Sequence, residues 1–180
     1  MSNNSSNFSN SSAMAVPMSR KDLRAITWHL RCRLGLNKEL YFPIIHFLEL
    51  ILPKIDPDFS LEILTKKEMG DCHGKSCPEE HKIYLRDDVY DGVCIDNGRD
   101  RFTVAHEAGH YLLHGAGKVK YARMNSGIII PAYMNPEWQA NTFAAELLAP
   151  PHLIKNMDYI DIACECKVSY TVARIQKSQK

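Results

Sequence analysis

The sequence lacks the features that mark a membrane protein or a protein of strong overall charge. No apolar run reaches the roughly 20 residues needed to cross a bilayer, and the longest, YFPIIHFLELIL, contains His46 and Glu49, as expected of a core helix. The formal net charge is only +1, so we expect no general electrostatic attraction to nucleic acid or to a membrane. The 180 residues, 45% hydrophobic and 24% charged, therefore suit one globular domain with a modest core.

The first sixteen residues lack both a basic start and an apolar stretch, so they resemble neither a signal peptide nor a foldable segment. We expect residues 1–16 to be disordered, with Met14 and Met18 as alternative translation starts. Because no secretory signal is present, the six cysteines are expected to be reduced thiols of a cytoplasmic protein. Cys72 and Cys77 lie near two histidines and leave a small structural zinc site open, although their spacing matches no familiar template.

Apolar residues at helical spacing predict helices, and alternating apolar residues predict strands. A capping-box pattern at Ser19 and Asp22 marks the start of the first helix, and Asn135-Pro136 marks the start of another. The predicted helices are 19–35, 43–52, 99–114, 135–149 and two short helices within 161–178; the predicted strands are 59–65 and 81–86. The remaining stretches, a surface loop at 68–80 and a long connection at 118–134, are rich in turn-forming or polar residues.

The stretch RFTVAHEAGHYLLHG carries three histidines at four-residue intervals, with Glu107 directly after the first. On a helix, His106 and His110 lie on one face about 6 Å apart, so both can bind one zinc ion. Glu107 is then close enough to hydrogen-bond a water on the metal and to accept its proton as the water attacks a carbonyl. His114 lies about 12 Å from His106 along the helix, too far to share the ion. The alternative is an ordinary buried helix that is rich in histidine, because the five-residue pattern also arises by chance.

A catalytic zinc site needs a third protein ligand. The helix that begins at Asn135 offers Glu137 and Glu146, which lie about 180° apart around the helix, so only one can face the metal. We choose Glu137, with Asn141 on the same face to orient the ligands through hydrogen bonds. The alternative for Glu137 is a surface glutamate that is favoured by the dipole at a helix start.

The chain resembles the ImmA/IrrE metallopeptidases, zinc proteins similar to gluzincins, in two linked motifs, RDRFTVAHEAGHYLLH and PEWQANTFAAELLAP. The resemblance extends over about residues 40–176, because KIYLRDDVYDG and VSYTVARI also fit. It implies that His106, His110 and Glu137 bind Zn²⁺ and that Glu107 is the general base and acid. It also implies cleavage of a helix-turn-helix repressor in a stress or mobile-element switch, without identifying the repressor, the cleaved bond or the trigger.

We therefore expect an α+β fold, with a zincin-like peptidase core of helices on a small mixed β-sheet and a short helical C-terminal appendage. The expected parts are a lead-in at 1–16, a metallopeptidase domain at 17–150 and a helical, helix-turn-helix-like tail at 151–180. The competing hypothesis is a non-catalytic regulator that docks on a repressor or on DNA through this tail. With five Lys/Arg and three Asp/Glu, the tail has a net charge of about +2, so direct DNA binding is not expected. A third hypothesis is an inactive relative, but no active-site residue is missing.

Two further features of the site stay open in the sequence. Tyr111, His114 and Tyr133 are unranked candidates for the donor that stabilises the developing oxyanion. The strand near KIYL is a candidate edge for an extended substrate, as in β-augmentation. The sequence does not indicate the oligomeric state.

Overall fold

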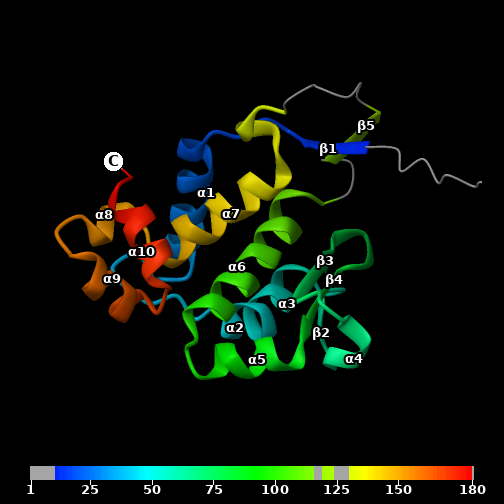
Figure 1. Cartoon of the computed structure of the whole chain (residues 1–180), viewed down its shortest axis with the longest axis horizontal. Coiled ribbons are helices and arrows are strands. Elements are labelled where there is room, and N and C mark those ends of the chain that lie inside the picture. Colours follow the sequence, from blue (N-terminus) through cyan, green and yellow to red (C-terminus); the bar gives the residue numbers. More distant parts are fainter. Residues whose placement is uncertain (1–10, 116–118, 124–129, 180) are drawn as a thin grey trace, which may run out of the picture.

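The computed structural model describes residues 11–115, 119–123 and 130–179, and it has the expected α+β composition (Figure 1). In chain order the elements are β1 (Ser11–Ala15), α1 (Arg20–Arg33), α2 (Ile44–His46), η1 (Phe47–Ile51), α3 (Leu52–Ile55), β2 (Ser60–Leu64), α4 (Lys66–Met69), β3 (Gly74–Cys77), η2 (Pro78–Glu80), β4 (Lys82–Arg86), α5 (Asp87–Cys94), α6 (Gly98–Leu113), β5 (Val119–Arg123), η3 (Ala132–Met134), α7 (Pro136–Leu148), α8 (Pro151–Ile154), α9 (Tyr159–Cys166) and α10 (Tyr170–Lys177). Within these ranges no helix is both long and apolar enough to cross a membrane.

A small mixed sheet packs beside α6, with the strand order β2-β4-β3 (Figure 1). Strand β4 runs parallel to β2 and antiparallel to β3, and it buries Ile83 and Leu85 completely. The surface loop that we expected at 68–80 is therefore wrong in part, because Gly74–Cys77 pair with β4 as strand β3. The strand near KIYL is not an edge either: both sides of β4 are paired, and β3 is the edge strand beside α6.

Helices α6 and α7 pack closely against each other and carry the two motifs (Figure 1). At the crossing, a Cβ on Gly109 would lie only 3.2 Å from the Cα of Ala140 and 3.1 Å from the ring of Phe143. A glycine there lets the two backbones approach more closely than any side chain would allow. The start of α7 is as predicted: the side chain of Asn135 accepts hydrogen bonds from the N–H groups of Glu137 and Trp138.

Helix α1 packs along α7, and its predicted capping box is confirmed by reciprocal hydrogen bonds between Ser19 and Asp22. The helix expected at 43–52 is present as three consecutive segments, α2, η1 and α3, of which η1 is a π-helix. The expected disorder of residues 1–16 is wrong for Ser11–Ala15, because antiparallel pairing with β5 satisfies the backbone of this segment. Residues 1–10, and residues 118 and 124–129 of the long connection expected at 118–134, lie outside the described ranges.

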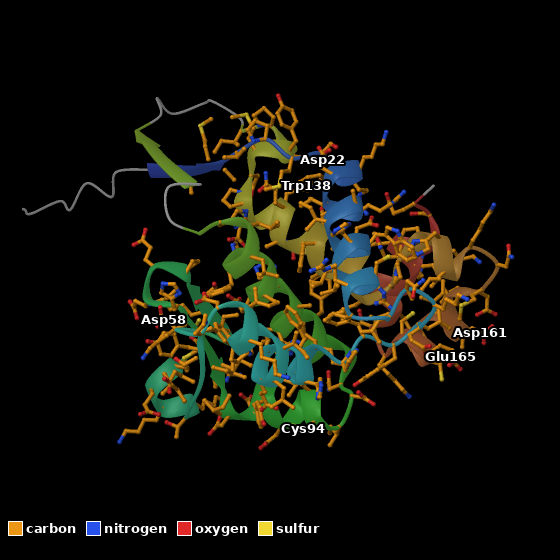
Figure 2. The ribbon with its side chains drawn as sticks, turned by 180° about the vertical axis from the view of Figure 1, so that it is seen from behind. Asp22, Asp58, Cys94, Trp138, Asp161 and Glu165 are labelled. Carbon is orange, nitrogen blue, oxygen red and sulfur yellow. The ribbon has the colours of Figure 1, made fainter. Side chains whose placement is uncertain are left out.

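In the C-terminal tail, α8 is followed by two short helices around a turn, α9 and α10, as predicted, and the tail shares the core of the rest of the chain. Buried Ile162, Cys166 and Ala173 belong to the same hydrophobic cluster as the core of α6 and α7. Fully buried Arg101 in α6 donates a hydrogen bond from Nε to the carbonyl of Lys167, 3.0 Å away, at the end of α9. The outer side of α9 carries exposed acidic residues, including Asp161 and Glu165 (Figure 2).

Candidate metal centre

Three predicted ligands from α6 and the first turn of α7 converge on one point. The Nε2 atoms of His106 and His110 are 3.0 Å apart. Glu137 places Oε1 3.2 Å from Nε2 of His110 and Oε2 3.4 Å from Nε2 of His106. The hydrogen bond from the Glu137 N–H to the Asn135 side chain, 2.8 Å long, sets the start of α7 beside α6. The structure thus brings together residues that are about thirty positions apart in the sequence.

These spacings fit a zinc ion. Ligand atoms about 2.0–2.1 Å from a tetrahedral ion lie about 3.3–3.4 Å from one another, close to the distances found here. Burial, reinforced by the neighbouring His106, lowers the pKa of His110 to about 4. The His110 ring is therefore neutral at physiological pH, which is the form of imidazole that binds metals. Two imidazoles and a carboxylate are also the donor set of one class of catalytic zinc sites.

Glu107 lies next to this centre, with 9% of its surface exposed. Burial, reinforced by the negative charge of Glu137, raises the pKa of Glu107 to about 7, while a hydrogen bond from the backbone N–H of Ser76 opposes the rise. Strand β3 supports the carboxylate from behind, since a Cβ on Gly74 would lie 2.8 Å from the Cγ of Glu107. Sequence reasoning missed both Gly74 and Ser76 of β3. The available signal was the turn with Pro78, which separates residues 74–77 from the strand at 82–86 and is typical of a connection between two strands.

Asn141 lies where a residue that orients a ligand would have to lie. Its Oδ1 is 3.1 Å from Nδ1 of His106, on the side of the ring opposite Glu137. An N–H donated from Nδ1 leaves the lone pair of Nε2 for a metal. His114 lies at the end of α6 beside His110, with 3.0 Å between their Nδ1 atoms.

A cleft of about 460 Å³ opens at the centre. One wall is β3 with η2, the opposite wall is the start of α7, and Ala13 of β1 contributes to the rim. The residues lining the cleft are Ala13, Ser76, Cys77, Pro78, Glu79, Glu80, His110, His114, Gly115, Pro136 and Glu137. The cleft therefore exposes two of the three ligands, His110 and Glu137, beside the edge strand β3.

The three candidate oxyanion donors are placed differently. Tyr111 points away from the ligands, and its hydroxyl donates a hydrogen bond to Asp56 at 2.5 Å. Burial together with this hydrogen bond raises the pKa of Tyr111 above its ordinary value. Tyr133, on η3, is 48% exposed and is not part of the cleft lining, whereas His114 is.

Glu146, the other candidate ligand of α7, lies on the far side of the helix from Glu137. It is fully buried and pairs with Arg20 Nη1 and Arg24 Nε of α1, each 2.9 Å away. The geometry therefore places Glu137, and not Glu146, beside the two histidines.

The alternative zinc site at Cys72 and Cys77 does not assemble. In the described part of the chain, the ligand groups close enough for a metal are His106/His110/Glu137 and Asp56/Asp58/His81, and neither contains a cysteine. His73 instead lies 2.8 Å from Arg86 Nη2, and Cys72 Sγ donates to the carbonyl of Gly74. All six cysteines are free.

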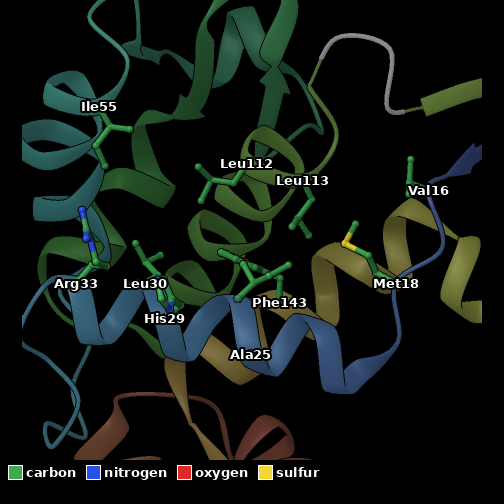
Figure 3. A pocket seen from close by; sticks show the side chains of 11 residues that line it. Val16, Met18, Ala25, His29, Leu30, Arg33, Ile55, Leu112, Leu113 and Phe143 are labelled. Atoms are coloured by element: carbon green, nitrogen blue, oxygen red, sulfur yellow. The ribbon is translucent and has the colours of Figure 1, made fainter.

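A larger cavity, of about 850 Å³, lies away from the ligands between α1, α3 and the end of α6 (Figure 3). Its lining is mostly apolar and includes Met18, Leu30, Ile55, Leu112 and Phe143. It contains no carboxylate, so it offers no acid–base pair for hydrolysis, and the chemistry belongs to the smaller cleft.

Comparison with known proteins finds a family model that matches this part of the chain. Residues 94–176 match the model of the family Peptidase M78, described as the IrrE N-terminal-like domain. The match covers α6, α7 and most of the tail, and it confirms the resemblance to the ImmA/IrrE family. No curated protein matches the chain.

Proposed function

Because residues 94–176 carry an IrrE N-terminal-like domain of the peptidase family M78, we propose that the chain is a zinc-dependent endopeptidase. The observation that carries the proposal is the convergence of His106, His110 and Glu137 next to the buried Glu107 carboxylate, with His110 and Glu137 open to a cleft. A histidine-rich core helix would require neither the third ligand from α7 nor an open cleft.

Zinc, when bound, supplies Lewis-acid activation of water and of the scissile carbonyl. His106, His110 and Glu137 would hold the ion, and Asn141 holds the His106 ring in place. Glu107 accepts a proton from the attacking water at its carboxylate oxygen and returns it to the nitrogen of the leaving peptide. A pKa near 7 in the metal-free protein suits both transfers, and a nearby cation lowers it toward the proton-accepting form.

The substrate would bind as an extended strand along β3, whose outer edge borders the cleft. Following the family resemblance, we propose that this substrate is a helix-turn-helix repressor and that cleavage releases genes of a stress response or a mobile element. The expected cytoplasmic location stays a prediction.

The competing hypothesis is a regulator that docks through its tail without catalysis. Against DNA as the docking partner, the exposed side of α9 presents Asp161 and Glu165, which would repel phosphates (Figure 2). Packing of the tail on the shared core also leaves its buried residues unavailable to a partner.

Glu107→Gln tests the two hypotheses against each other. The wild type should hold about one zinc per chain by elemental analysis and should cleave a co-expressed repressor from the same genetic neighbourhood. Glu107→Gln should keep the zinc and the repressor binding and lose the cleavage, because the amide cannot accept the proton. Glu165→Gln, an exposed change of the same chemistry, is the control that should cleave normally. Unchanged cleavage by Glu107→Gln, or a folded wild type without zinc, would overturn the proposal that the chain is a zinc-dependent endopeptidase.

A further inference from the structure

We propose that Gln139 and His114 form a hydrogen-bond relay that holds His110 as the tautomer with its proton on Nδ1. This tautomer leaves the Nε2 lone pair of His110 free for the metal. The inference rests on the proposed function, because it takes His110 as a zinc ligand. It makes His114 and Gln139 positioning residues that act on the metal site through the ring of His110.

The relay starts at two backbone carbonyls. Gln139 is fully buried, and its Nε2 donates hydrogen bonds to the carbonyls of Val16 and Tyr133, each 2.8 Å away. If the Gln139 amide were flipped, its Oε1 would face these two carbonyl oxygens, and neither of them has a proton to donate. The orientation of Gln139 is therefore determined, and its Oε1 faces His114.

The orientation of the amide then determines both histidine tautomers. Nε2 of His114 lies 2.9 Å from Oε1 of Gln139, so it must carry a proton. In its neutral form the imidazole of His114 has this one N–H, so its Nδ1 is an acceptor. Nδ1 of His110, 3.0 Å from it, must then be the donor. The two rings, one helical turn apart, hold opposite tautomers.

The same reasoning, applied to His106, shows why a cation would stabilise the arrangement of the three ligands. Asn141 Oδ1 accepts the proton of His106 Nδ1, so Nε2 of His106 is unprotonated as well. Two imidazole lone pairs and the Glu137 carboxylate then face one another within 3.4 Å with no proton between them. These acceptors repel one another until a cation lies among them.

His114 does not fit the alternative role of an oxyanion donor. Its Nε2 is engaged by Gln139, and its Nδ1 faces the ring of His110 on the side opposite the metal position. Groups that orient metal ligands in this way typically contribute about 10–100-fold to metal affinity.

The test reads the tautomers directly and uses the full chain. Long-range ¹H–¹⁵N correlation spectra of the metal-free wild type should show the proton on Nδ1 in His110 and on Nε2 in His114. Zinc dissociation constants, from competition with a chromophoric chelator, should rise about 10–100-fold in His114→Phe and in Gln139→Leu. His114→Gln, whose side chain again offers one acceptor and one donor, should restore most of the affinity.

This pair of variants separates the relay from simple packing, because phenylalanine preserves the ring whereas glutamine preserves only the hydrogen bonds. His46→Phe, at an exposed histidine of α2, is the matched control and should bind zinc like the wild type. The proposed relay would be overturned by a proton on Nε2 of His110, or by zinc binding in His114→Phe as tight as in the wild type. Neither result would contradict the proposed peptidase function. A wild type without zinc would instead overturn the proposed function, and the tautomers of the metal-free protein would still decide the relay.

Discussion

Replacing Glu146 by alanine should destabilise the fold and spare the zinc, whereas replacing Glu137 should remove the zinc and spare the fold. The two glutamates lie on the same helix, but Glu146 is fully buried between two arginines and the side chain of Glu137 is 66% exposed beside the histidines. The paired variants therefore test the assignment of the third ligand.

The magnitude follows from the contacts of Glu146. Its carboxylate accepts hydrogen bonds from Arg20 Nη1 at 2.9 Å and from Arg24 Nε and Nη2 at 2.9 and 3.3 Å. Removing one partner of a buried ion pair costs about 3–5 kcal/mol. The arginine side chains are 28% and 29% exposed and can regain water, so we expect the lower end of that range. A loss of about 3 kcal/mol lowers the Tm of a chain of this size by about 6–12 °C.

The assay is urea and thermal unfolding of the metal-free protein in EDTA, with zinc content measured separately after dialysis against zinc. Glu137→Ala should change the unfolding free energy by less than about 1 kcal/mol, as exposed substitutions usually do. Glu165→Ala should change neither quantity. Loss of zinc from a folded Glu146→Ala protein, with zinc retained in Glu137→Ala, would refute the reasoning and move the third ligand to Glu146.

Three further substitutions test other parts of the structure. Gly74→Ala should lower kcat/KM by at least about tenfold at unchanged zinc content, because the new Cβ would lie 2.8 Å from Glu107 Cγ and displace the carboxylate; unchanged kinetics would show that β3 does not position Glu107. Asp56→Asn should lower the pKa of His81 in an NMR titration, since the hydrogen bond to Asp56 is the main cause that raises it. The stability that the raised pKa of His81 contributes is fully present below the ordinary pKa of 6.5 and is lost as the pH rises through the raised pKa. Asp56→Asn should therefore remove this pH dependence of stability. Identical His81 titrations in the wild type and the variant would contradict the role of Asp56. Arg101→Ala should destabilise the protein by about 3 kcal/mol in urea, because it leaves buried carbonyls without their charged donor; a loss below 1 kcal/mol would mean that this arginine does not hold the tail.

Helix starts were predictable because capping is local chemistry. Ser19 and Asn135 each accept hydrogen bonds from N–H groups two or three residues ahead, so the signal lies within one turn of sequence. The pairing of His106 with His110 follows from helical periodicity for the same reason. The choice of Glu137 over Glu146 depends on how two helices pack, which spacing alone left open; we chose Glu137 from the residues, and the resemblance implies the same ligand.

The strands near the cleft were not predictable in this way, because the partner of a strand lies elsewhere in the chain. The segment 74–77, GKSC, has little intrinsic preference for a strand and becomes one through its hydrogen bonds with β4. The segment 11–15 becomes one through β5. The directions of Tyr111 and His114 depend on Asp56 and Gln139, which no local pattern connects to them.

The close approach at Gly109 has a consequence for the choice of ion. Because no side chain at Gly109 separates α6 from Ala140, the two helices lie close together, and the Glu137 carboxylate on α7 lies 3.2–3.4 Å from the imidazoles of His106 and His110 on α6. Calcium binds six to eight oxygens at about 2.3–2.6 Å, so it would need wider spacing and more oxygen ligands than two histidines and one carboxylate provide. A side chain at this helix crossing would press α7 and its carboxylate away from the imidazoles, so the missing methyl group at Gly109 keeps the three ligands at the spacing of a small ion such as zinc.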